Sequence, residues 1–166
     1  MTPKVALVMG SDSDLPALRP CIKALQKFGI SVEARVLSAH RTPDAAATFA
    51  KNAKARGISV IIGAAGKAAH LPGVLAAYTT LPVIGIPIKS STMDGLDSLL
   101  SIVQMPKGIP VATVAIDGGE NAAILAAQIL ALSHPEVAEK LDAHKLDMLR
   151  EVSEKDTRLQ EELQNL

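Results

Sequence analysis

The sequence has very few aromatic residues. Two phenylalanines, one tyrosine and no tryptophan make up 2% of the 166 residues. Hydrophobic residues nevertheless account for 48% of the chain. Many of them are alanines, whose small side chains let helices and strands approach one another closely. This amount of apolar surface is enough for one domain with a sizeable core, and too little for two.

Cysteine occurs only once, at Cys21. A single cysteine excludes an internal disulfide, and it fits a reducing compartment. Its surroundings, LRPCIKAL, predict a buried thiol on a helix rather than a reactive nucleophile. The four histidines have no zinc-ligand spacing, and no nucleophile elbow marks a Ser-His-Asp triad, so we expect neither a metal site nor serine-hydrolase chemistry.

The chain also lacks an excess of charge of either sign. It has 17 basic and 17 acidic residues, which gives a formal net charge of zero. No basic stripe is present, so we expect no nucleic-acid partner. No apolar run reaches the roughly 18 residues of a membrane-spanning helix, and no signal-peptide pattern precedes the first predicted strand. We therefore expect a soluble, cytoplasmic protein with no membrane contact.

Short apolar runs rich in β-branched residues alternate with alanine-rich helical stretches. The predicted strands are residues 5–9, 32–37, 60–62, 83–88 and 111–116. The predicted helices are residues 14–28, 43–56, 69–79, 94–103 and 120–132. Continuous apolar runs are typical of strands that are buried on both faces of a parallel sheet. The alternation therefore predicts an α/β fold, a flavodoxin-like doubly wound parallel sheet of five strands.

The composition becomes charged from Pro135 onward, and apolar residues recur there at separations of four and seven. These residues are Val137, Leu141, Met148, Val152, Leu159 and Leu163. The spacing predicts one apolar stripe on a long C-terminal helix. We predict an α/β catalytic domain over residues 1–134 and a helical extension over residues 135–166. The stripe lies either on its own domain or on a neighbouring subunit, and we favour the neighbour.

The loops that follow the strands carry most of the unusual chemistry, and ligands bind at this end of doubly wound sheets. The loop after the first strand reads GSDSD, residues 10–14. Ser11, Ser13 and Asp14 offer polar groups beside free backbone N–H groups, which suits a phosphate. An ordinary helix cap explains the same residues equally well. A dinucleotide-binding fingerprint is excluded, because the G-x-G-x-x-G spacing is missing.

The loop after the third strand reads GAAGKAAHLPG, residues 63–73. It has no aspartate, which excludes a phosphoacceptor receiver domain. Ala68 stands where a P-loop needs Ser or Thr, so a P-loop is excluded as well. The stretch is nearly free of side chains, which lets a ligand lie against the backbone, and His70 follows at the beginning of a helix.

The loop after the second strand reads SAHRTPD, residues 38–44, and Thr42 with Pro43 marks a helix start. Arg41 can bind a phosphate that GSDSD also holds, because the first two strands are neighbours in this topology. His40 can exchange protons near neutral pH, which suits a general acid and base. An exposed arginine and a surface histidine explain this loop taken alone, but a second histidine on a nearby loop favours a site.

Four segments together resemble the family of bacterial N5-carboxyaminoimidazole ribonucleotide (N5-CAIR) mutases, the catalytic PurE subunit of purine biosynthesis. They are VMGSDSD, SAHRTPD, AAHLPG and DSLLSIVQMPKGIPVATVAI. The resemblance implies an isomerase that needs no metal, ATP or organic cofactor and moves a carboxylate from N5 to C4 of the imidazole, giving 4-carboxy-5-aminoimidazole ribonucleotide (CAIR). It also implies a homo-octamer whose terminal helix reaches a neighbour. An ATP-dependent N5-CAIR synthetase is then a functional partner.

The resemblance also implies roles for individual residues. His40 matches the catalytic histidine, a general acid and then base for decarboxylation and recarboxylation, and His70 matches a second histidine of the carboxylate pocket. Ser11 and Arg41 match residues that bind the phosphate, and Asp14 matches a residue directed towards the ribose. The same loops supply the other candidate substrate-binding residues: Ser13, Ser38, Ala39, Gly66, Lys67, Ala68 and Leu71.

One residue departs from the family pattern. Lys67 stands where such mutases have a small residue, usually glycine. A cation beside the pocket fits a carboxylase that takes 5-aminoimidazole ribonucleotide (AIR) and CO2 directly. We favour the mutase, because AAHLPG is otherwise intact. The alternatives are the AIR carboxylase and a non-catalytic ribonucleotide-binding module.

Overall fold

The computed structural model describes residues 2–166, and its five parallel strands form a single sheet. The strands are β1 (Lys4–Met9), β2 (Ser31–Val36), β3 (Val60–Gly66), β4 (Val83–Ile88) and β5 (Ala112–Thr113). Their order in the sheet is β2-β1-β3-β4-β5, with every pair parallel. The chain therefore reverses its winding direction after β2, which is the flavodoxin-like doubly wound topology predicted from the sequence.

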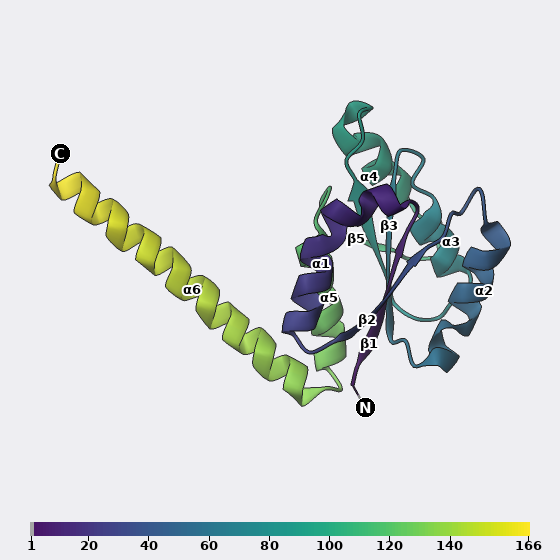
Figure 1. Cartoon of the computed structure of the whole chain (residues 1–166), viewed down its shortest axis with the longest axis horizontal. Helices are drawn as coiled ribbons and strands as arrows, with labels where there is room; N and C mark the ends of the chain where they lie inside the picture. Colours follow the sequence, from purple (N-terminus) through teal and green to yellow (C-terminus); the bar gives the residue numbers. More distant parts are fainter. Residues whose placement is uncertain (1) are drawn as a thin grey trace.

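Helices cover both faces of the sheet (Figure 1). On one face lie α1 (Leu15–Lys27) and α5 (Gly119–Ala131), and on the other lie α2 (Pro43–Ala53), α3 (Leu71–Ala77) and α4 (Leu96–Val103). Short 3-10 turns adjoin α1, α2 and α4: Asp12–Asp14, Lys54–Arg56 and Met93–Gly95. The five predicted helices are therefore all present, and their boundaries differ from the predicted ones by a few residues.

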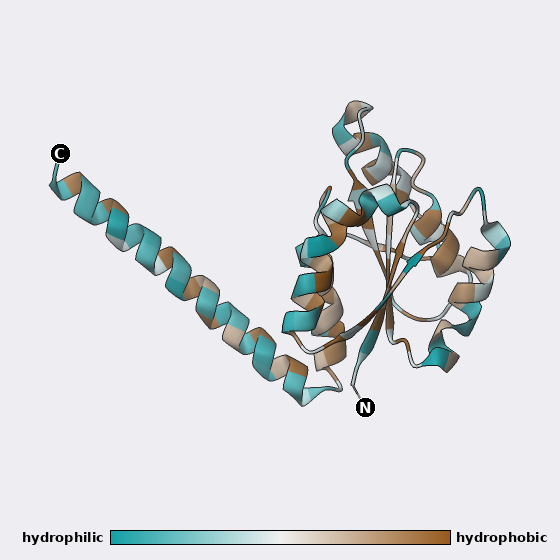
Figure 2. Ribbon diagram, viewed as in Figure 1, coloured by the Kyte–Doolittle hydropathy of each residue, from teal (hydrophilic) through white to brown (hydrophobic). Residues whose placement is uncertain are grey.

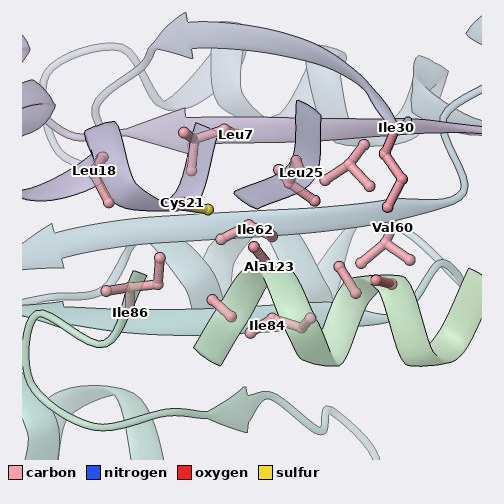
Figure 3. Packing of buried hydrophobic residues seen from close by; sticks show 14 of the residues in the cluster. Leu7, Leu18, Cys21, Leu25, Ile30, Val60, Ile62, Ile84, Ile86 and Ala123 are labelled. Carbon is pink, nitrogen blue, oxygen red and sulfur yellow. The ribbon is translucent and has the colours of Figure 1, made fainter. Parts of the chain in front are cut away.

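Successive residues of one strand enter two different cores. Val5 and Leu7 of β1 belong to the core beneath α1 and α5, whereas Ala6 and Val8 belong to the core on the opposite face. Figure 3 shows the first core, where side chains of α1, α5 and the central strands interdigitate. Because both faces of β1 are buried, its sequence reads as a continuous apolar run.

Cys21 lies in this first core, on α1, and is completely buried. Burial raises the pKa of its thiol to about 12. The prediction of a buried thiol on a helix is therefore confirmed, and the raised pKa keeps this thiol protonated at neutral pH.

Three of the predicted strands differ from the observed ones. β2 is not buried on both faces, because it is an edge strand that pairs only with β1, and Val36 is 53% exposed. β5 contains two residues instead of six. β3 continues four residues beyond the predicted end, and its small residues there let α3 approach closely: a Cβ at Gly63 would lie 3.1 Å from the Cα of Pro72.

The long helix α6 (Pro135–Gln164) begins where the composition changes. Val137 is completely buried and Leu141 packs against the same core. The His144 ring also packs edge to face on Phe28, with centroids 5.7 Å apart. Beyond His144 the helix leaves the domain (Figures 1 and 2), and the rest of the predicted stripe, Met148, Val152, Leu159 and Leu163, is between 37% and 64% exposed. No helix in residues 2–166 is both long and apolar enough to cross a membrane.

Candidate active site

A cleft of about 620 Å³ lies at the carboxyl ends of the strands, where the strand order reverses. The loops after β1, β2 and β3 form most of its wall. Every candidate site residue predicted from the sequence lines this cleft: Ser11, Ser13, Asp14, Ser38, Ala39, His40, Arg41, Gly66, Lys67, Ala68, His70 and Leu71. The carboxyl ends of parallel strands share one edge of the sheet, so the topology gathers these distant segments.

Sequence reasoning missed a fourth part of the wall, the loop after β4. Lys89, Ser90 and Ser91 line the cleft there. The backbone N–H of Lys89 donates a hydrogen bond to the Asp117 carboxylate over 2.9 Å, so the loop after β5 holds this segment in place. The signal was available, because KSSTMDG follows a buried strand as directly as the three predicted loops do.

Two histidines meet inside the cleft. His40 Nε2 lies 2.7 Å from His70 Nδ1, and the two rings stand edge to face with centroids 4.9 Å apart. One ring nitrogen must donate and the other must accept, so each histidine fixes the tautomer of its partner. His40 follows β2 and His70 follows β3, although β1 separates these strands in the sheet.

A group of hydrogen-bonding side chains lies at the β1 end of the cleft. The Arg41 guanidinium reaches from the β2 loop to the carbonyl of Gly10, with Nη2 3.4 Å from the oxygen. The Ser13 hydroxyl donates a hydrogen bond to the Ser11 hydroxyl over 2.8 Å, and the Ser13 N–H also donates to the Ser11 hydroxyl. A guanidinium, two hydroxyls and the amino end of a helical turn together suit an oxyanion such as phosphate.

The helix start predicted at Thr42 and Pro43 is correct. Thr42 precedes α2, but its hydroxyl forms no capping bond with that helix. Instead it accepts from the N–H of Ser38 and donates to the Ser38 carbonyl, over 2.9 and 3.1 Å. The Ser38 hydroxyl in turn accepts from the N–H of Arg41. These bonds close the loop on itself and fix the direction in which His40 and Arg41 leave the backbone.

Asp14 is the acidic residue of the cleft wall. Burial raises the pKa of its carboxyl group above the ordinary 3.8, a hydrogen bond from the Ser11 backbone opposes this shift, and the charges of Asp117 and Asp12 add to it. Asp14 makes no capping bond to α1, whereas the Ser11 hydroxyl caps the turn Asp12–Asp14 by accepting from the Ser13 N–H, so the alternative of an ordinary cap holds for Ser11. Within residues 2–166, no three His, Cys, Asp or Glu side chains are grouped closely enough to hold a metal ion.

Comparison with known proteins agrees with this arrangement. The family model described as AIR carboxylase matches residues 4–151. The N5-carboxyaminoimidazole ribonucleotide mutase of Pyrococcus horikoshii is 58% identical over 159 residues, which cover 96% of this chain and 90% of that protein. The phosphoribosylaminoimidazole carboxylase of Schizosaccharomyces pombe is 50% identical over 159 residues, 96% of this chain and 29% of that protein.

Comparison with solved structures points to the same group of proteins. The crystal structure of Treponema denticola PurE superposes with a TM-score of 0.87 at 30% sequence identity and covers 95% of this chain and 98% of that one. The resemblance inferred from the loop segments is therefore confirmed: the chain belongs to the AIR carboxylase family.

Proposed function

We propose that this protein is an N5-CAIR mutase that forms CAIR in de novo purine (IMP) biosynthesis. One observation carries the proposal: the paired rings of His40 and His70 share a cleft with the serine and arginine group of the β1 end. A nucleotide anchored by its phosphate at that group can present its heterocycle to His40. Relatives named as mutases support this assignment at 50–60% identity over most of the chain.

Binding depends on both ends of the cleft. The phosphate is bound by Ser11, Ser13 and Arg41, and Asp14 accepts a hydrogen bond from a ribose hydroxyl. The backbone and small side chains of Ser38, Ala39, Gly66 and Ala68, together with Leu71, form the wall against which the imidazole and the carboxylate lie. Few atoms project from this wall, so ring and carboxylate can approach the backbone closely.

In the reaction the enzyme first donates one proton to N5 of the substrate and later takes one proton back from C4. His40 in its acid form donates a proton to N5 as the N5–carboxyl bond breaks, and CO2 is released into the cleft. C4 of the electron-rich ring then attacks this CO2, held at near-attack distance. Neutral His40 removes the C4 proton, which restores the aromatic ring and the acid form of the enzyme. His70 orients His40 and fixes its tautomer.

The experiment supplies the two carboxyl sources separately. The protein is incubated with N5-CAIR at low CO2, and in parallel with AIR and bicarbonate, and CAIR is measured. A mutase forms CAIR rapidly from N5-CAIR. Product only from AIR and bicarbonate identifies the AIR carboxylase, the alternative favoured by Lys67 and by the carboxylase name of the Schizosaccharomyces pombe relative. Binding of both nucleotides without any product identifies a ribonucleotide-binding module.

The proposal includes the setting of the enzyme. Residues 1–134 form the catalytic domain. The extension over residues 135–166 begins on this domain at Val137 and Leu141, and its remaining stripe packs on a neighbouring subunit of a homo-octamer. The exposed apolar stripe of α6 supports this packing. The protein acts in the cytoplasm, where an unpaired cysteine stays reduced. An ATP-dependent N5-CAIR synthetase supplies the substrate, because forming a carbamate from bicarbonate requires activation.

A further inference from the structure

Lys67 has an unusual backbone conformation for a lysine. Its φ is +55°, in the left-handed region that favours glycine. Two tight turns follow it: the N–H of Ala69 donates to the Lys67 carbonyl, and the N–H of His70 donates to the Ala68 carbonyl, each over 2.8 Å. Ala69 is completely buried, whereas Lys67 and Ala68 are exposed and line the cleft. The turns thus bury the middle of the loop and leave Lys67 at the cleft.

A side chain at positive φ destabilises the folded chain relative to glycine. Strain of this kind concentrates at functional sites, where the side chain does something that glycine cannot. What the lysine adds here is a positive charge three residues before His70. The conformation therefore points to a use for that charge in the cleft.

The cleft contains three cationic side chains, and they differ in their partners. Arg41 belongs to the serine group at the β1 end. The Lys89 ammonium lies 3.4 Å from the Asp94 carboxylate. Among residues 2–166, Lys67 is the cleft lysine with no carboxylate within 4.0 Å. Its ammonium is therefore available for an anionic group of a ligand.

The substrate of the proposed reaction has two anionic groups, a phosphate and a carboxylate. The proposed function assigns the phosphate to Ser11, Ser13 and Arg41 at the β1 end. The carboxylate must lie near the paired histidines, because the proton transfers at N5 and C4 occur there. Lys67 and His70 belong to the same pair of turns, so the lysine stands beside this end of the cleft.

We infer that Lys67 is a specificity-determining residue whose ammonium binds the carboxylate of N5-CAIR and CAIR, and this inference rests on the proposed function. The carboxylate is charged in the substrate and in the product, but this charge is lost when CO2 forms, because His40 protonates N5 as the N5–carboxyl bond breaks. The ion pair therefore stabilises the bound ground states more than the reacting state. Its removal raises KM for N5-CAIR and does not lower kcat.

The test compares two nucleotides that differ only in the carboxylate. Binding of CAIR and of AIR to Lys67→Met, Lys67→Arg and the unaltered protein is measured by isothermal titration calorimetry. For Lys67→Met we expect CAIR to bind about fivefold more weakly, the size of a partly exposed ion pair, and AIR to bind within about twofold of the unaltered protein. Lys67→Arg keeps the charge and should keep most of the preference for CAIR.

A second variant separates the effect of the charge on CAIR binding from the effect of the substitution on stability. Lys67→Gly removes the charge and relieves the left-handed strain, so its melting temperature should rise by ~2 °C while CAIR binding weakens as in Lys67→Met. A glycine variant that binds CAIR as tightly as the unaltered protein overturns the inference. Equal weakening of AIR and CAIR in Lys67→Met also overturns it, because the lysine then binds the phosphate.

Failure of the proposed function gives a different result. If the unaltered protein binds neither AIR nor CAIR, the ribonucleotide assignment itself is wrong. If it binds both and Lys67→Met changes neither affinity, the ribonucleotide assignment stands and only the role of Lys67 is refuted.

Discussion

His40 Nε2 and His70 Nδ1 lie 2.7 Å apart, although their strands are separated in the sheet by β1. Such a pair cannot carry N–H groups on both facing nitrogens without losing its hydrogen bond. When one of the two facing nitrogens carries a proton, the other must therefore be unprotonated, or the two rings must move apart. In the proposed mechanism His40 transfers the protons, and His70 holds it in the orientation and tautomer that this requires.

Replacing His40 should abolish turnover and spare binding. For His40→Asn we expect kcat to fall by at least about 10³-fold, within the range for general acid–base catalysis. The dissociation constant for AIR should change by less than about twofold, because the residues that bind the phosphate are intact. Steady-state assays of N5-CAIR conversion and calorimetry of AIR binding measure the two effects. His134→Asn, outside the cleft, is the matched control, and near-normal turnover in His40→Asn would refute the assignment.

Replacing His70 should act through His40. His70→Leu removes the hydrogen bond and should lower kcat by about 10–100-fold. In the double variant with His40→Asn, the second change should have almost no further effect, because the two residues act as one unit. His70→Asn, which can still hydrogen-bond, should retain more activity than His70→Leu. Additive losses in the double variant would show that His70 acts independently of His40.

The Asp14 carboxylate should lower the stability of the fold at neutral pH, although it strengthens nucleotide binding. Its pKa is raised in the folded protein, chiefly by burial, so the folded state binds this proton more tightly than the unfolded state. The ionised carboxylate therefore destabilises the fold at neutral pH, and this destabilisation fades as the pH falls below the raised pKa towards 3.8.

Asp14→Asn should accordingly melt at a higher temperature than the unaltered protein at pH 7, and the difference should shrink as the pH is lowered to 4. The same substitution should weaken AIR binding, because the amide is a poorer acceptor for a ribose hydroxyl. Thermal unfolding followed by circular dichroism across this pH range checks the sign. Asp142→Asn, on the exposed surface of α6, is the control. Lower stability of Asp14→Asn at pH 7 would contradict the burial argument.

The exposed stripe of α6 should be required for assembly. Val152 and Leu159 are 64% and 50% exposed in the single chain, and the double substitution Val152→Asp and Leu159→Asp would introduce two charges into the proposed subunit interface. We expect a smaller particle by size-exclusion chromatography with light scattering, and no loss of secondary structure. Glu154→Gln, on the opposite face of the helix, should leave the mass unaltered. An undiminished mass for the double aspartate variant would exclude the stripe as an interface.

Much of the fold follows from local sequence pattern. The runs of β1 and β4 are buried on both faces, so their continuous apolar sequences predict central strands almost to the residue. The prediction for β2 failed on burial, because the segment is not a continuous apolar run: Glu33 and Arg35 alternate with the valines and the alanine, a pattern typical of a strand with one exposed face. β5 was predicted too long, because beyond Thr113 the chain runs beside β4 without regular strand geometry. The N–H groups of Val114 and Asp117 still donate hydrogen bonds to β4 there.

The sequence by itself determined which segments reach the cleft, because the carboxyl ends of parallel strands must share one edge. Only the tertiary structure decided how the side chains meet there. The contact of His40 with His70 depends on contacts between segments far apart in the chain, such as the hydrogen bond from the N–H of Gly10 to the carbonyl of Ala64. Local propensity is fixed by neighbouring residues, whereas these distances are set by packing of the whole sheet.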